Sequence, residues 1–331
     1  MIVDCAHYRD GQRQHEGAMD LDRAAEICVG GDAGFVWLGM FEPEPAELTE
    51  VQRRFGLHDL AVEDAQSFHL RPKIEQYDDG NVYFVVLRTA RYDEAREAVE
   101  FGEVSVFISS RFVITVRQGV ASDLHGARLR LERRPELLKE GPAAILWAIL
   151  DKVVDDYAPV LEGLEHDVEE VEATVFGGAA APTERIYFLR REATDFYRAV
   201  HPLLGPLDAL ERGAYLEVSH ELSQFLRDVN DHLKLVNEEV IAQRDLLAII
   251  LAGEHGRHLR CPDRDRRSSE RDDQATDPDG HDLPAAVVPH GLLRHELRLA
   301  GRPPHVRVGV PGRRRRKPRA FHPRAVHVVP P

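Results

Sequence analysis

The sequence predicts an α+β fold, in which an N-terminal mixed α/β domain is followed by long antiparallel helices. Two observations lead to this prediction. Strand-like and helix-like segments are mixed before residue 120. Between residues 143 and 251, apolar residues recur at intervals of three and four, the spacing of helices that bury one face. We expect a mixed domain at 1–140, long helices at 141–251 and a tail at 252–331.

The N-terminal domain is expected to contain short strands, one clear helix and a hairpin. Residues 1–40 read as strands and turns that close on Phe35–Leu38, and a helix is expected over Ala46–Phe55. Val82–Leu87 has the apolar run of a buried strand. Apolar residues alternate over 104–108 and again over 112–116, on either side of a short polar turn, which predicts a β-hairpin.

Three apolar seams define the long helices. The first comprises Trp147, Leu150, Val154, Tyr157, Leu161, Leu164, Val168, Val171 and Val175. The second comprises Ile186, Leu189, Ala193, Phe196, Val200 and Leu203. The third comprises Leu226, Val229, Leu233, Val236, Val240, Gln243, Leu247 and Ile250. Carboxylates between the positions of the first seam predict one strongly acidic face: Asp155, Asp156, Glu162, Glu165, Asp167, Glu169, Glu170 and Glu172.

The pattern ends at Ala252–Gly253, after the increasingly apolar segment Asp245–Leu251. The charge changes sign at the same point. Residues 1–251 carry 26 Lys and Arg against 47 Asp and Glu, whereas residues 252–331 carry 17 against 10 and only one of the 23 aromatic residues. The sequence as written has no run of about 20 apolar residues, so no transmembrane helix is predicted.

Several functional classes find no support in the sequence. The three cysteines lie far apart, which argues against a disulfide framework and a structural zinc site. No nucleophile–base pair, phosphate loop or metal triad is evident, so we do not expect an enzyme. His58, Glu63 and Asp64 are interpreted as part of a helix with an acidic face rather than as a catalytic or metal site. No nucleic-acid partner is expected, because the basic run Arg313–Arg319 is interpreted below as a product of the reading frame.

Six segments together resemble the CorA family of magnesium and divalent-cation channels. They are Trp37–Leu38, His58–Ala65, Arg71–Tyr77, Phe112–Val116, Leu150–Tyr157 and Phe225–His232, and they occur in collinear order over about residues 35–251. The resemblance implies a homopentamer whose N-terminal part is a cytoplasmic funnel. It further implies that the last long helix continues into the plasma (inner) membrane and lines a pore ending in a Gly-Met-Asn motif. The implied function is transport of Mg²⁺, with Co²⁺ and Ni²⁺ as further ions, gated by cytoplasmic Mg²⁺.

By position, the resemblance implies a regulatory Mg²⁺ site between neighbouring subunits. Asp93 of one subunit would act with Asp228 or Asp231 of the next. Carboxylate oxygens are ligands that Mg²⁺ accepts. The alternative interpretation is that these residues are surface carboxylates that aid solubility.

The pore motif is absent from the sequence as written, and the tail has the composition of a wrong reading frame. Codons compatible with Arg294–Ala300 can encode Gly-Met-Asn when they are read one base later. We therefore hypothesise a one-base shift near Leu251–Glu254, which separates a CorA-type gene from its membrane part.

The chain as written is then expected to be non-conducting, with a disordered tail, and to be cytoplasmic or aggregated. The alternative function is a soluble acidic coiled-coil domain that acts as a cation sensor or scaffold.

Overall fold

The computed structural model describes residues 1–258 except residues 16, 31–32, 78–81, 121 and 178–182. These described residues belong to one compact unit. Nearly all of the predicted disordered tail lies outside the described residues. This part includes the basic run Arg313–Arg319 and the segment Arg294–Ala300, whose codons are compatible with the pore motif.

A seven-stranded sheet has the order β2-β1-β3-β7-β6-β5-β4. Strands β3 and β7 pair in parallel, and the other described neighbours pair antiparallel. The strands are β1 (Ile2–Arg9), β2 (Gln12–Arg13), β3 (Phe35–Phe41), β4 (Lys73–Tyr77), β5 (Val82–Asp93), β6 (Ala98–Ile108) and β7 (Phe112–Gly119).

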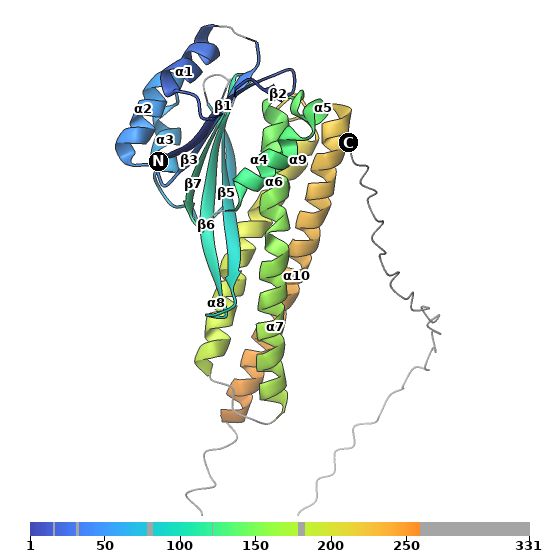
Figure 1. Cartoon of the computed structure of the whole chain (residues 1–331). Helices are drawn as coiled ribbons and strands as arrows, with labels where there is room; N and C mark the ends of the chain where they lie inside the picture. The colour runs from blue at the N-terminus through green and yellow to red at the C-terminus, as the bar shows by residue number, and fades with distance from the viewer. Residues whose placement is uncertain (16, 31–32, 78–81, 121, 178–182, 259–331) are drawn as a thin grey trace, which may run out of the picture. The chain divides into compact units, whose positions relative to one another are not determined.

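Helices cover both faces of the sheet (Figure 1). One face is covered by α1 (Leu21–Gly30), α2 (Pro45–Phe55) and α3 (Asp59–Ala65). The other is covered by a helical layer built from α4 (Leu124–Glu132), α5 (Pro135–Leu138), α6 (Pro142–Asp155), α7 (Tyr157–Phe176), α8 (Thr183–Val200), the 3₁₀ helix η2 (His201–Leu203), α9 (Leu204–Glu211) and α10 (His220–His258). The predicted α+β class is confirmed.

The predicted hairpin is β6–β7, and its alternating residues serve two cores. Val104 and Val106 of β6 pack in the core beneath the long helices, whereas Phe107 packs in the core beneath α1–α3. This division follows from the geometry of a strand, in which successive side chains point to opposite faces.

The buried strand predicted at Val82–Leu87 continues through Asp93. Arg88 and Thr89 interrupt its apolar run, yet both are buried, because the extended part of β5 lies against the helical layer. The hydroxyl of Tyr157 on α7 donates a hydrogen bond to the carbonyl oxygen of Arg88. A tertiary contact of this kind leaves no signal in the local sequence.

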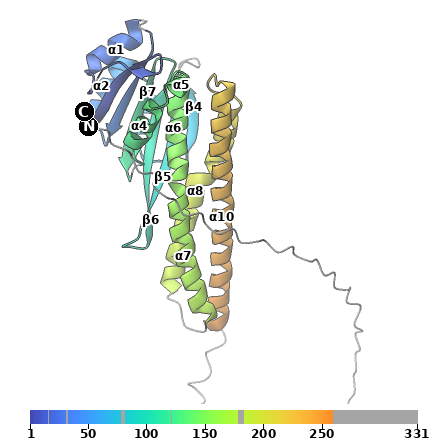
Figure 2. The same ribbon diagram turned by 45° about the vertical axis from the view of Figure 1, so that its right-hand side comes forward.

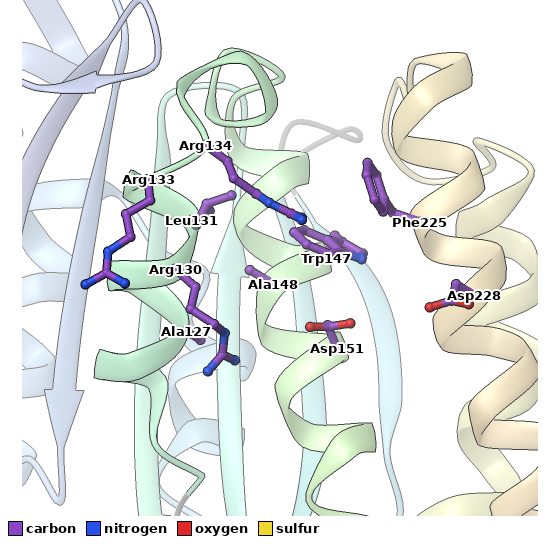
Figure 3. A pocket seen from close by; sticks show the side chains of 10 residues that line it. All are labelled: Ala127, Arg130, Leu131, Arg133, Arg134, Trp147, Ala148, Asp151, Phe225 and Asp228. Atoms are coloured by element: carbon purple, nitrogen blue, oxygen red, sulfur yellow. The ribbon is translucent and has the colours of Figure 1, made fainter. Parts of the chain in front are cut away.

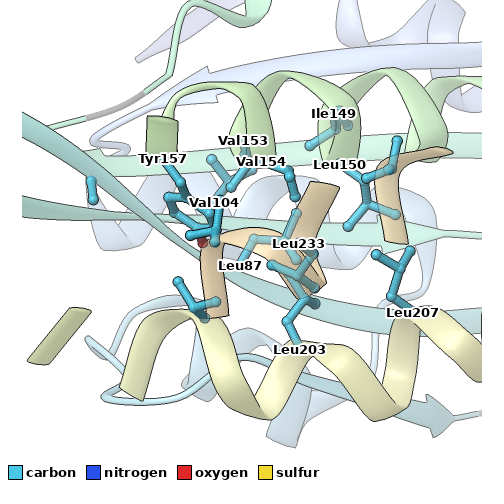
Figure 4. Close-up of a cluster of buried hydrophobic side chains, with 14 of the residues drawn as sticks. Leu87, Val104, Ile149, Leu150, Val153, Val154, Tyr157, Leu203, Leu207 and Leu233 are labelled. Atoms are coloured by element: carbon cyan, nitrogen blue, oxygen red, sulfur yellow. The ribbon is translucent and has the colours of Figure 1, made fainter. Parts of the chain in front are cut away.

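The three predicted seams form the core between the sheet and the long helices (Figure 4). Every seam residue is buried except Leu161, which is half-buried. The first seam spans α6 and α7, which are separated only at Asp156, while the second follows α8 and η2. The third follows α10, which lies beside α7 along much of its length (Figure 2).

The predicted acidic face is wrong at Asp167, whose side chain is buried. The other carboxylates of α7 that were assigned to this face are exposed or half-buried. Asp167 lies inward because it receives a hydrogen bond from Tyr92 and pairs with Arg185, so its charge is balanced inside the protein.

The last helix extends beyond the end of its apolar pattern. The pattern stops at Ala252–Gly253, but the helical backbone of α10 continues to His258. Within the described part of the chain, no helix is long and apolar enough to cross a membrane.

One close contact in this core can be tested at Gly163 on α7. A Cβ atom added there would lie 2.4 Å from Cγ of Tyr92, on the ring that packs against the helix. We expect Gly163→Ala to lower the free energy of unfolding by about 1–3 kcal/mol, because the overpacked site forces the helix and hairpin apart. Urea unfolding of the purified chain measures the change.

The matched control is Gly253→Ala on α10, where an added Cβ meets no atom within 4 Å. It should be neutral or stabilise the helix by up to about 1 kcal/mol. Equal effects of the two substitutions would contradict the assigned contact.

Candidate cation-sensing site

Asp93 lies at the end of β5, beside the turn that leads into β6. Its side chain is 24% exposed. The Oδ1 atom accepts a hydrogen bond of 3.0 Å from the backbone N–H of Ala95, and Oδ2 lies 3.5 Å from Nε of Arg96. The carboxylate is therefore fixed by its own turn and keeps a limited exposed surface.

The hairpin that carries Asp93 is attached to α7 and α8 by polar contacts. Tyr92, next to Asp93, donates a hydrogen bond of 2.8 Å to Asp167. Arg185 of α8 lies 3.0 Å from the same carboxylate and 3.2 Å from Glu97 in the turn. Burial raises the pKa of Asp167, whereas the bond from Tyr92 and the charge of Arg185 act in the opposite direction.

Glu192 of α8 makes a second buried attachment to the hairpin. Its Oε1 accepts a hydrogen bond of 2.6 Å from the backbone N–H of Val99 in β6, while its buried Oε2 has no hydrogen-bond partner among the described residues. Burial raises the pKa of Glu192 to about 7, because the charged form loses its water. The hairpin is thus joined to α8 through a group that titrates near neutral pH.

Asp228 lies on α10 at a cavity of about 580 Å³ between α4, α6 and α10. Asp151 of α6 faces Asp228 across this cavity, and Trp147 and Phe225 lie above the two carboxylates (Figure 3). Burial raises the pKa of Asp151, and the negative charges of Asp155 and Asp228 act in the same direction. The cavity therefore has a carboxylate on α6 and another on α10, and it is also lined by Arg130 of α4 and by Arg133 and Arg134, which follow that helix.

Asp231 is exposed on α10 and pairs with Lys234 at 3.0 Å. It follows Asp228 by three residues, so both lie on the same face of the helix. The carboxylate of Asp231 is exposed on the outer surface and does not line the cavity of Asp228.

A single chain keeps Asp93 apart from the acidic residues of α10. Tyr92, the neighbour of Asp93, packs on Gly163 of α7. Asp228 faces Asp151 of α6, which precedes Gly163 by twelve residues. At 1.5 Å per residue this separation is about 18 Å along the helices, too far for one ion to bridge. No group of three metal-ligating side chains occurs among the described residues. An ion shared by Asp93 and Asp228 therefore requires a second copy of the chain.

Glu63 and Asp64 lie on a helix, α3, as the sequence interpretation held. Nδ1 of His58 accepts a hydrogen bond from the backbone N–H of Leu60 and caps α3, the helix that contains both carboxylates. Asp64 pairs with Lys73 of β4.

Sequence reasoning did not single out Asp151, Asp167 or Glu192 as functional candidates. Asp167 and Glu192 each lie three residues after a seam residue, Leu164 and Leu189 respectively. A carboxylate at this spacing lies beside the buried stripe of its helix. This position is the signal by which the sequence could have identified Asp167 and Glu192 as buried. The identity of its partners on β5 and β6 is a tertiary property.

The family model described as CorA-like Mg²⁺ transporter protein matches residues 32–252. The match covers strands β3 to β7, the helical layer as far as residue 252 of α10, and every candidate residue above. The family is one of ion transporters rather than enzymes. The chain belongs to the CorA-like Mg²⁺ transporter family.

Two relatives show the extent of the similarity. The putative metal ion transporter YfjQ of Bacillus subtilis is 26% identical over 219 residues, which are 65% of this chain and 66% of that protein. The cobalt/magnesium transport protein CorA of Thermotoga maritima is 27% identical over 199 residues, which are 60% of this chain and 56% of that protein. The matched region thus spans less than two thirds of each relative.

Solved structures share the fold. The CorA magnesium transporter of Methanocaldococcus jannaschii has a TM-score of 0.58 at 16% identity, with 78% of each chain covered. The full-length CmaX protein has a TM-score of 0.63 at 16% identity, with 88% of this chain and 90% of that chain covered.

The attachment of the hairpin through Glu192 predicts a pH dependence. Because the pKa of Glu192 in the folded chain is raised from 4.5 to about 7, its contribution to stability is complete below about pH 4.5 and is lost as the pH rises through 7. Glu192→Gln keeps the acceptor for Val99 but has no charge. The variant should therefore lose this part of the pH dependence. At pH 8 its free energy of unfolding should exceed that of the parent by about 1 kcal/mol or more.

Unfolding free energies at a series of pH values test this prediction. Glu184→Gln, which changes an exposed carboxylate on the same helix, is the matched control and should leave the profile unaltered. Parallel profiles for the parent and Glu192→Gln would contradict the assignment.

Proposed function

We propose that the described part of the chain is the cytoplasmic, ion-sensing part of a homopentameric channel for Mg²⁺, with Co²⁺ and Ni²⁺ as further ions. Mg²⁺ binds between copies, at Asp93 of one copy and Asp228 or Asp231 of the next, and holds the closed arrangement. When the cytoplasmic concentration of Mg²⁺ falls, the ion leaves this site. The carboxylates of the two copies then repel each other and separate. The family match over residues 32–252 is the observation that carries this proposal.

The arrangement of the carboxylates supports a site that is completed by a second copy. Asp228 and Asp231 are exposed on α10, and Asp93 retains an exposed surface at the hairpin turn. Mg²⁺ keeps several of its waters and needs only one or two carboxylates from a protein. Two facing copies can therefore supply a sufficient set of ligands, although one chain does not.

Limited proteolysis tests the sensor. Mg²⁺ should slow cleavage of the parent chain, and Asp93→Asn should need about tenfold more Mg²⁺ for the same protection, because one of few carboxylate ligands is lost. Asp10→Asn removes an exposed carboxylate from another turn and should behave as the parent. Unchanged protection in Asp93→Asn would refute the sensor.

We further propose that a one-base shift near Leu251–Glu254 separates this sequence from the family's membrane helices. Resequencing the genomic DNA across codons 245–300 is the direct test, and one missing or extra base should restore Gly-Met-Asn. The frame-restored chain should fractionate with membranes, while the chain as written should not. Confirmation of the present frame would favour the alternative, an acidic helical domain that senses cations or acts as a scaffold.

A further inference from the structure

The cavity between α4, α6 and α10 contains charges of both signs that are not paired within the chain. In Figure 3 the side chains of Arg130 and Arg134 extend toward the cavity, whereas that of Arg133 extends the other way. We call Arg130 and Arg134 the arginine pair, and the facing Asp151 and Asp228 the carboxylate pair. None of these four side chains forms an ion pair with a described residue.

This mixture of charges disfavours a simple ion as the ligand. Burial raises the pKa of Asp151, and the charges of Asp155 and Asp228 act in the same direction, against those of Arg130 and His232. A small anion alone would be repelled by the carboxylate pair, and a metal ion alone would be repelled by the arginine pair. A ligand that holds a metal ion next to phosphate groups satisfies both pairs at once.

An aromatic pair, Trp147 and Phe225, forms an apolar wall of the same cavity. The two ring centroids are 5.2 Å apart, and Phe225 is half-buried, so part of its ring remains accessible. The guanidinium of Arg134 lies 5.8 Å from the centroid of Phe225. Because a cation already stands over this ring, an organic cation would gain little there. A planar base can instead stack on the ring or on the guanidinium plane.

Trp147 also supplies a hydrogen-bond donor that the chain leaves unsatisfied. The residue is 8% exposed, and its buried Nε1 has no hydrogen-bond partner among the described residues. A buried N–H without an acceptor is costly, so an acceptor that reaches it is favoured. Arg134 is exposed and lines the same cavity, so its side chain can move toward a bound phosphate and open access to this nitrogen.

The size of the cavity and its set of polar groups fit a nucleotide. Its volume of about 580 Å³ lies within the range of about 300–1,000 Å³ that is usual for small-molecule sites. Mg²⁺ at such sites is commonly held by one or two carboxylates together with substrate phosphates, and the carboxylate pair supplies that number. Guanidinium groups form strong, charge-assisted hydrogen bonds to phosphate oxygens.

We propose that this cavity binds a nucleoside diphosphate or triphosphate as its Mg²⁺ complex. The phosphates lie against the arginine pair, the ion joins them to the carboxylate pair, and the base packs on the aromatic pair. The site is contained in one chain, whereas the Mg²⁺ sensor proposed above requires a second copy. With Asp228 engaged in this way, Asp231 is the carboxylate left on α10 for the sensor. Either proposal can therefore fail without the other.

Isothermal titration calorimetry of the full chain with ADP and Mg²⁺ tests the proposal. Pyrophosphate with Mg²⁺ should bind about tenfold more weakly than ADP with Mg²⁺, because it has no base to stack. ADP in EDTA should also bind about tenfold more weakly, because its phosphates then face the carboxylate pair without the ion. Failure of ADP with Mg²⁺ to bind at millimolar concentration, or equal binding of pyrophosphate, would overturn the proposal.

The arginine pair is tested by a double substitution. Arg130→Gln with Arg134→Gln should weaken binding of ADP with Mg²⁺ at least about tenfold, because charge-assisted hydrogen bonds to the phosphates are lost. The matched control is Arg53→Gln with Arg212→Gln, which removes two exposed arginines on α2 and at the end of α9. Equal losses in the two double variants would mean that only net charge matters, and would refute the site.

The carboxylate pair is tested by the direction of two changes. Asp151→Asn should weaken binding of ADP with Mg²⁺ about tenfold, because a ligand of the ion is lost. It should strengthen binding of ADP in EDTA, because a charge that repels the phosphates is removed. A folding defect would weaken both, so opposite changes identify the ion contact. Changes in the same direction would contradict it.

The aromatic pair is tested at Phe225, whose side chain is half-buried. Phe225→Leu keeps an apolar side chain without the ring, so it should abolish most of the preference for ADP over pyrophosphate. Circular dichroism establishes that the variant is folded. An unchanged preference would refute the placement of the base.

Discussion

Burial of the apolar seam of α6 and α7 is the constraint on which the rest of the described structure depends. This seam packs against the sheet on one side and against α8 and α10 on the other, so it joins the two predicted regions into one core. Tyr157 lies where they meet, fully buried and bonded to β5. Apolar burial contributes about 25 cal/mol per Å², and so a continuous seam is the main source of stability for the long helices.

The extended β5–β6 hairpin follows from this packing. The hairpin donates hydrogen bonds to two helix carboxylates, from Tyr92 to Asp167 of α7 and from the Val99 backbone to Glu192 of α8. Both carboxylates are buried beneath the helices and removed from water. Buried carboxylates are costly unless they are paired or neutral. Arg185 and Tyr92 supply partners for Asp167, whereas Glu192 keeps one oxygen unpaired and its pKa is raised. The turn that holds Asp93 is thereby connected to α8 through the charged Arg185 and through Glu192, whose protonation depends on pH.

The surfaces left outside the core carry opposite charges on neighbouring helices. Charge on a helix surface is usually a solvated feature with little effect on stability. Here α7 carries exposed glutamates and α8 exposed arginines, and the ion pair described between the two helices joins the buried Asp167 to Arg185 instead.

The sequence by itself determined the long helices, the β6–β7 hairpin and the α+β class, because periodicity at 3.6 and 2 residues reports directly which side of an element is buried. It did not determine α1 (Leu21–Gly30), which lies where strands and turns were expected. It also determined that Glu162, Glu169 and Asp228 lie on exposed helix positions. Only the tertiary structure decided that β5 continues past Arg88, that Asp167 lies inward beside Tyr92, and that Asp151 faces Asp228. These features depend on partners that are distant in the chain, and local periodicity carries no information about which distant residue supplies a hydrogen bond or a compensating charge.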